Sequence, residues 1–134
     1  MSQENVEIVK RGWEHFLRTG EQPEELIASD FVWDMSTFRD LMGPQQHYEG
    51  VEGIRRFLHE WTDSFDEWQI ELERFHDAGD KVVVVCRQRG RSKASGVPVD
   101  MMFAQVFTLR DGLETRMEMY ADPDEALKAV GLEE

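Results

Sequence analysis

Side chains suited to proton transfer recur near the C-terminal end of the chain. Two strand-like runs flank Asp111-Gly112, a dipeptide typical of a two-residue hairpin loop. Such a loop sets Gln105 opposite Glu118, and directly opposed residues share one face of a sheet. That face then carries Phe103, Gln105, Phe107, Arg116, Glu118 and Tyr120. The pattern predicts a pocket wall with an amide and a carboxylate among aromatic rings.

Glu118 is the strongest candidate for a catalytic acid or base on this face. A carboxyl group in an apolar pocket has a raised pKa and can exchange protons near neutral pH. Arg116 lies two residues away on the same face, so a structural Arg116–Glu118 pair is the alternative. Gln105 either donates to a carbonyl oxygen or satisfies a neighbouring polar group. Tyr120 is a catalytic phenol or a packed aromatic at the rim.

Asp34 and His47 are two further candidates for acid–base chemistry. Asp34 is either a base at the floor of the pocket or a solvated residue at a strand end. His47 precedes a helix, where it serves as an acid or base near the pocket mouth or simply faces solvent. The other histidines, His15, His59 and His76, lack ligand spacing, so no metal site is expected. No cofactor is expected, because phosphate-loop, nucleophile-elbow and dinucleotide motifs are missing.

Large aromatic and polar side chains on the predicted helices and strands suggest a roomy apolar cavity. The ligand-binding candidates are Trp13, Phe57, Trp61, Gln88, Phe103, Gln105, Arg116 and Tyr120. The chain has four tryptophans, which favours a cavity for an apolar small molecule, although ordinary core packing is the alternative for most of these rings.

The elements that must position these residues are readable from apolar spacing. Helical periodicity runs from Val6 to Leu17 and again after Gly50, and a capping-box pattern at Asp122 opens a short last helix. Strand-like runs begin near residues 31, 68, 81, 99 and 114. The order predicts one α+β domain over residues 1–134, with helices gathered on one face of a curved antiparallel sheet.

The opposite face of the predicted sheet is apolar. It carries Val83, Val85, Ala104, Val106, Met117 and Met119. Exposed on a monomer, these side chains would form a large apolar patch, so they predict a homodimer.

Composition excludes several classes of partner. The formal net charge is −13, which argues against nucleic acid and against anionic membrane surfaces. Cys86 is the single cysteine, so no intrachain disulfide can form, and the chain has no signal pattern or membrane-length apolar run. A cytoplasmic location is the default expectation.

The order of elements resembles the nuclear transport factor 2-like superfamily, and within it the SnoaL-like polyketide cyclase and ketosteroid isomerase-like domains. The resemblance spans nearly the whole chain. It is carried by the phrases EGVEGIRRFL at 49–58, DAGDKV at 77–82, GVPV at 96–99, FTLRDG at 107–112 and EALKAVGL at 125–132.

This resemblance implies a cone-shaped fold, a deep pocket between the long helices and the concave sheet face, and a homodimer joined through sheet surfaces. The tyrosine, base and protonated aspartate of ketosteroid isomerases fall at Trp13, Met35 and Gln105, so all three differ here. Limonene epoxide hydrolase-like enzymes carry a carboxylate at the position of Glu118.

Three kinds of function remain open at this point. The chain is an enzyme moving protons without a cofactor (isomerisation, cyclisation or epoxide opening), a protein that binds an apolar small molecule without chemistry, or a dimeric accessory domain.

Overall fold

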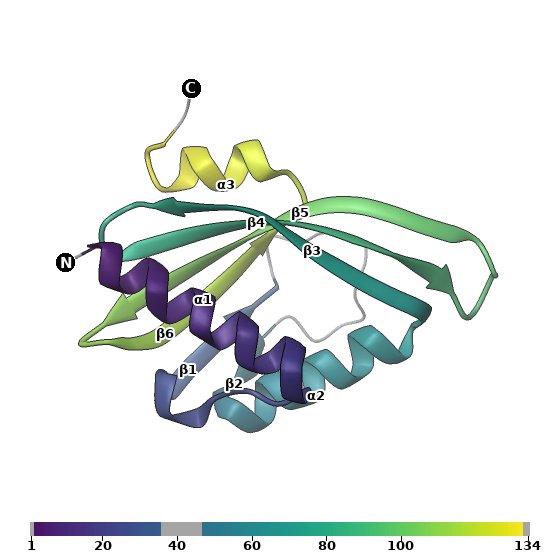
Figure 1. Cartoon of the computed structure of the whole chain (residues 1–134), viewed down its shortest axis with the longest axis horizontal. Helices are drawn as coiled ribbons and strands as arrows, with labels where there is room; N and C mark the ends of the chain where they lie inside the picture. Colours follow the sequence, from purple (N-terminus) through teal and green to yellow (C-terminus); the bar gives the residue numbers. More distant parts are fainter. Residues whose placement is uncertain (1, 36–46, 133–134) are drawn as a thin grey trace.

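Two long helices lie across one side of a curved sheet (Figure 1). The structure, a computed structural model, describes residues 2–35 and 47–132. The elements are α1 (Ser2–Thr19), the 3-10 helix η1 (Glu24–Leu26), β1 (Ile27–Asp34), β2 (His47–Glu49), α2 (Gly50–Asp63), β3 (Phe65–Asp77), β4 (Lys81–Ser92), β5 (Pro98–Arg110), β6 (Leu113–Tyr120) and α3 (Pro123–Ala129). The expected α+β class and cone-shaped architecture are confirmed.

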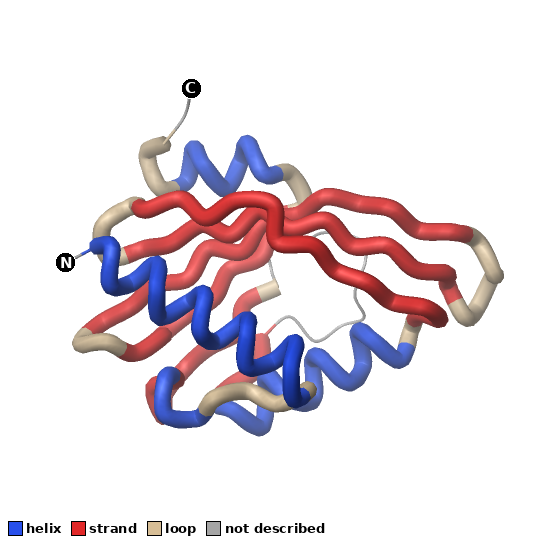
Figure 2. Tube along the Cα trace, in the orientation of Figure 1, coloured by secondary structure: helices blue, strands red, loops and turns tan. Residues whose placement is uncertain are grey.

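The sheet of the described residues is mixed rather than purely antiparallel. Its strand order is β2-β1-β6-β5-β4-β3, and every neighbouring pair is antiparallel except β1 and β6, which run in parallel. Figure 2 shows these strands in red and the helices in blue. The expectation of an antiparallel sheet was correct for β3 to β6, because tight hairpins dictate direction there. It was wrong for β1, which is far from β6 in sequence and has no hairpin to set its direction.

The main core fills the space between the helices and the concave face of the sheet. Val9 of α1 and Ile54 and Phe57 of α2 are each 1% exposed, and they meet the inward side chains of β4 and β5. Helical spacing places the buried residues of each helix on one stripe that faces the sheet. Burying each of these side chains stabilises the fold by roughly 1.5–3 kcal/mol. The same stripe positions the residues of the site described below.

A β-bulge in the last hairpin changes which residues of β6 face the core. Arg110 pairs with Leu113 and Leu109 with Glu114, as the Asp111-Gly112 loop predicts. The register then shifts, so that Gln105 pairs with Met119 and Val106 with Glu118. The predicted pairing of Gln105 with Glu118 was therefore wrong, because one extra residue in a strand turns every later side chain to the other face.

On the convex face of the sheet, α3 covers part of β4 and β5 (Figure 1). Its Ala126 is fully buried against a cluster formed by Val83, Val85, Ala104 and Val106, and Leu127 and Val130 pack around it. Asp122 caps the helix, because its side chain accepts a hydrogen bond of 2.9 Å from the backbone N–H of Asp124. The apolar patch that motivated the homodimer is thus occupied within one chain.

Met117 and Met119, the other members of the predicted patch, lie in the main core instead. Both are almost fully buried, at 0% and 2% exposure. Among the described residues, no helix combines the length and apolar character needed to cross a membrane.

Candidate functional site

A pocket opens between α1, α2 and the concave face of the sheet. It is lined by Val9, Gly12, Trp13 and Phe16 of α1, Gln22, Trp33 of β1, Ile54 and Leu58 of α2, Gln105 and Phe107 of β5, and Glu114 of β6. The room for the centres of water-sized molecules is about 30 Å³, within a total of about 400 Å³ of space between the atoms that includes open solvent at the mouth. Most of the lining is apolar or aromatic, and Glu114 is the one titratable side chain among these residues.

Glu114 is a buried carboxyl group. It is 5% exposed, and burial raises its pKa from 4.5 to about 8. The hairpin turn places the side chain on the concave face, opposite Leu109. In the described part of the chain, no hydrogen bond or ion pair reaches this carboxyl, so at neutral pH it is mainly a neutral group with an O–H to donate.

Space for the Glu114 carboxyl comes from a glycine in the middle of α1. A Cβ atom at Gly12 would lie 3.4 Å from Glu114 Oε2, at the short end of ordinary van der Waals contact. Glycine in a helix interior costs roughly 1 kcal/mol relative to alanine. We attribute its presence here to the close approach of the carboxyl.

Gln105 lines the same pocket as Glu114, four residues along β5 from Leu109, the partner of Glu114, and it is held in one orientation. Its Oε1 accepts a hydrogen bond of 3.1 Å from Trp13 Nε1. An indole N–H can only donate, so the ring determines which end of the amide is oxygen. The Nε2 hydrogens of Gln105 are left for another acceptor, and the side chain is only 2% exposed.

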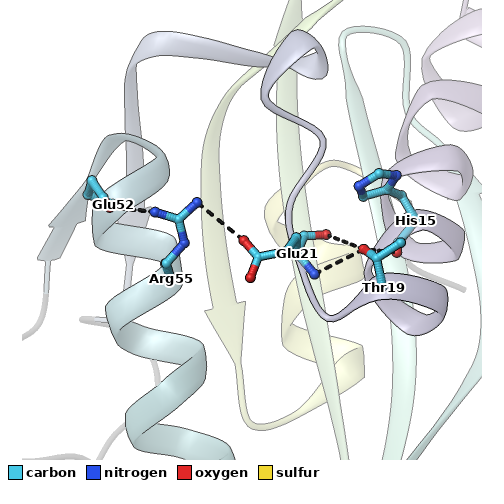
Figure 3. A network of polar contacts seen from close by, with 5 residues as sticks. All are labelled: His15, Thr19, Glu21, Glu52 and Arg55. Atoms are coloured by element: carbon cyan, nitrogen blue, oxygen red, sulfur yellow. Dashed lines mark hydrogen bonds and ion pairs between the residues drawn. The ribbon is translucent and has the colours of Figure 1, made fainter.

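Charged residues join the two helices at the pocket mouth (Figure 3). Arg55 of α2 contacts Glu52 one turn earlier and also Glu21, in the loop after α1, at 3.3 Å. Thr19 steadies this loop, because its hydroxyl donates to the carbonyl of His15 at 2.8 Å and accepts from the N–H of Glu21 at 3.1 Å. Glu21 and Arg55 line a neighbouring depression that shares Phe16, Gln22 and Leu58 with the pocket.

A second polar centre lies farther along the concave face. Gln88 of β4 is 1% exposed, and its Oε1 accepts hydrogen bonds of 2.8 Å from both Trp61 Nε1 and Trp68 Nε1. Cys86, on the same strand face, is fully buried, and burial raises the pKa of its thiol, which makes the thiol unreactive.

Three of the expected site residues meet on the other face of the sheet. Asp34 is 4% exposed and accepts a hydrogen bond from Arg116 Nη2, while His47 Nε2 lies 3.4 Å from Asp34 Oδ1. Glu118 and Tyr120 also lie on this face, and burial, with nearby carboxylates at Glu118 and Asp34, raises the pKa of Tyr120.

The structure therefore divides the expected site residues into two groups. Trp13, Phe57, Trp61, Gln88, Phe103 and Gln105 lie on the concave face, whereas Asp34, His47, Arg116, Glu118 and Tyr120 lie on the convex face. The expectation that Glu118, Arg116 and Tyr120 share a pocket wall with Gln105 was wrong, because of the bulge. The predicted Arg116–Glu118 pair is replaced by the Arg116–Asp34 ion pair.

Sequence reasoning did not single out Glu114. The signal was available, because the Asp111-Gly112 loop by itself pairs Glu114 with Leu109 on the face of Gln105. Within the described ranges, no group of three or more histidine, cysteine, aspartate or glutamate side chains is arranged to hold a metal ion.

Comparison with known proteins adds a family and a fold. A family model described as a SnoaL-like domain matches residues 9–117. No curated protein matches the chain.

Three similar solved structures illustrate the shared fold. TerC co-crystallised with polyporic acid has 22% sequence identity and a TM-score of 0.71, covering 95% of this chain and 98% of TerC. A proposed SnoaL-like polyketide cyclase from Jannaschia sp. CCS1 has 25% identity and a TM-score of 0.67, covering 96% and 92%. A nuclear transport factor 2-like protein from Burkholderia thailandensis E264 has 23% identity and a TM-score of 0.73, covering 92% and 95%.

Proposed function

Since the chain belongs to the SnoaL-like domain family, we propose that its pocket binds a small apolar carbonyl compound and polarises the carbonyl group. The proposal is supported chiefly by Glu114, a buried carboxyl in a pocket of apolar and aromatic side chains. A buried titratable group with a strongly shifted pKa inside a pocket is typical of a functional site. The polyporic acid of TerC supports a cyclic, oxygen-bearing molecule as the class of ligand.

Two hydrogen-bond donors line the pocket and are available to ligand oxygens. Glu114, neutral because burial raises its pKa to about 8, offers an O–H, and Gln105 offers an Nε2 hydrogen because Trp13 occupies its oxygen. Donors aimed at an oxygen that gains negative charge stabilise that charge strongly where water is excluded. The ring surfaces of Trp13, Trp33 and Phe107 bind the apolar body of the ligand.

Polarisation of this kind makes the carbon next to the carbonyl more acidic. As a water molecule removes a proton from that carbon, the electron pair moves to the carbonyl oxygen, and Glu114 transfers its proton to the oxygen. The product is an enol and an ionised Glu114, which regains its proton when the enol returns to the ketone. No redox partner or metal is required by this sequence of steps.

Deuterium exchange into the methyl group of acetophenone tests the chemistry directly. In deuterium oxide near neutral pH, the wild-type protein is expected to accelerate the exchange above the buffer rate, as followed by proton NMR. Glu114→Gln should lose about a hundredfold or more of this acceleration, because removing a general acid usually costs at least that much.

Glu118→Gln is the matched control, because it makes the same change on the same strand but on the opposite face of the sheet. It should retain the wild-type exchange rate. Equal exchange in wild type, Glu114→Gln and buffer would refute the catalytic part of the proposal.

Ligand binding without catalysis is the second candidate function. It is favoured by one observation, namely that no second titratable side chain accompanies Glu114 among the described lining residues. Binding alone predicts that acetophenone binds more tightly than its hydrocarbon isostere α-methylstyrene, with no accelerated exchange.

A further inference from the structure

The pocket alone is too small to enclose a ring compound. Its room for the centres of water-sized molecules is about 30 Å³. A cavity that binds benzene measures about 150 Å³. A ring compound whose carbonyl group reaches Glu114 therefore extends through the mouth of the pocket, and the residues outside the mouth help to select it.

The neighbouring depression offers space for the rest of such a ligand. It adjoins the pocket, because Phe16, Gln22 and Leu58 line both. Its room for the centres of water-sized molecules is about 350 Å³. The side chains that line only the depression are polar, namely Glu21, Arg55, His59 and Thr62. A ligand that occupies both spaces thus has an apolar end and a polar end.

The loop after α1 brings Glu21 near the carboxyl group of Glu114. The position of a Cβ atom at Gly12 lies 3.4 Å from Glu114 Oε2 and 4.0 Å from Pro23 Cγ, so the loop passes close to the carboxyl. Glu21 precedes Pro23 by two residues, which span at most about 7 Å. One ring compound with a short side chain is long enough for this separation.

The charges beside the depression leave Glu21 with a weakly held carboxylate (Figure 3). Arg55 Nη1 donates to both carboxylate oxygens of Glu52, at 2.5 and 2.7 Å, whereas Glu21 Oε1 lies 3.3 Å from Nη2 of the same guanidinium. Two carboxylates and one guanidinium sum to a net charge of −1. His59 lies 3.2 Å from Asp63, so this pair adds no net positive charge.

Two broader features favour a cation in the depression. The C-terminal end of α1 borders it at Phe16 and Gly20, and the backbone dipoles of a helix leave partial negative charge at that end. The whole chain has a formal net charge of −13, which attracts cations over longer distances. An ammonium group gains from these charges, whereas a carboxylate would have to displace Glu21 from Arg55 against them.

We propose that the ligand of the pocket carries a protonated amine, which binds Glu21 in the depression while its carbonyl group lies at Glu114. The ligand class is an apolar ring compound with a carbonyl on one side and an ammonium group on the other. This inference rests on the proposed function and makes Glu21 a residue that determines specificity. Glu21 is 58% exposed, so its side chain can turn from Arg55 to the ammonium group without disturbing the core.

Three probes with the same ring test the charge preference. Para-aminomethylacetophenone is a cation, para-hydroxymethylacetophenone is its neutral counterpart of equal size, and para-acetylbenzoate is an anion. Dissociation constants are measured by ligand-observed NMR at low salt. The wild-type protein is expected to bind the amine about threefold more tightly than the alcohol, as for an exposed ion pair, and the anion most weakly. Added sodium chloride should reduce the preference.

Substitutions at the depression separate Glu21 from the field of the whole molecule. Glu21→Gln should abolish the preference for the amine. Glu24→Gln is the matched control, because it removes the same charge at an exposed residue of η1 that does not line the depression. It should keep the wild-type preference. Arg55→Gln is a second test, and it should increase the preference, because Glu21 then has no guanidinium partner.

Equal binding of amine and alcohol by the wild-type protein, tighter binding of para-acetylbenzoate than of the amine, or equal losses in Glu21→Gln and Glu24→Gln would overturn the inference. Acetophenone and α-methylstyrene test the Glu114 end separately. A preference for acetophenone without a preference for the amine would contradict only the role of Glu21. Absence of both preferences would contradict the proposed function as well.

Discussion

At the scale of single residues, the environment of a carboxyl group decides its chemistry. Glu114 and Glu118 are the same amino acid on the same strand, four residues apart. Glu114 is enclosed in apolar surroundings, which raise its pKa to about 8, whereas Glu118 is half-buried on the opposite face. Only Glu114 lies where a ligand in the pocket can meet it.

The raised pKa of Glu114 predicts that pH changes the stability of the protein. In the unfolded chain this group loses its proton near pH 4.5, but in the folded protein only near pH 8. Folding therefore retains a proton over this interval, so the contribution of Glu114 to the free energy of unfolding falls as pH rises from about 4.5 to about 8. The loss reaches roughly 4 kcal/mol at the upper end.

Urea unfolding of wild type, Glu114→Gln and Glu118→Gln at several pH values measures this effect. The Glu114→Gln protein should gain stability relative to wild type as pH rises, because it has no proton to retain. Glu118→Gln should follow wild type. Parallel curves for wild type and Glu114→Gln would show that the carboxyl titrates normally.

At the scale of elements, the bulge in the last hairpin determines which residues of β6 reach the core. It directs Met117 and Met119 inward, and it sends Arg116, Glu118 and Tyr120 to the convex face. On that face Arg116 pairs with the nearly buried Asp34 of β1. A single extra residue thus separates the two groups of polar side chains.

Truncation of β6 side chains distinguishes the bulged register from a regular one. Met117→Ala should cost about 3 kcal/mol of unfolding free energy, as expected for removing a fully buried side chain. Glu118→Ala should cost less than about 1 kcal/mol, because it lies half-buried on the convex face. Equilibrium denaturation measures both, and the reverse order of costs would contradict the bulge.

Sequence patterns predicted the helices, the four hairpin strands and the concave position of Gln105 and Gln88. Apolar spacing and turn residues determine these features locally. The bulge has no comparable local signal, because Thr115, the extra residue between Glu114 and Arg116, is an ordinary strand residue. The predicted position of Glu118 was therefore wrong. The alternation of Met117 and Met119 with polar residues was the available hint that these two side chains face the core.

At the scale of the whole molecule, helices pack on both faces of the sheet. The helices α1 and α2 cover the concave face, and α3 covers the apolar patch of Val83, Val85, Ala104 and Val106 (Figure 1). The dimer stays a prediction, but this patch no longer supports it.

Displacement of α3 should expose that patch and cause self-association. Ala126→Glu places a charge at a fully buried contact of α3, so the helix should detach from the sheet. Ala129→Glu is the matched control, because the same change is made at an exposed residue near the end of the helix. Sedimentation velocity should show larger species for Ala126→Glu only, and identical profiles for the two variants would refute this role of α3.

We propose above all that a neutral Glu114 donates a hydrogen bond to a carbonyl oxygen in the pocket. The stretching frequency of isotope-labelled acetophenone bound to the protein reports this bond most directly. We expect a frequency below that in hexane, a return towards the hexane value in Glu114→Leu, and loss of the low-frequency band as pH rises through about 8. A bound carbonyl at its hexane frequency, unchanged by Glu114→Leu and by pH, would contradict the claim.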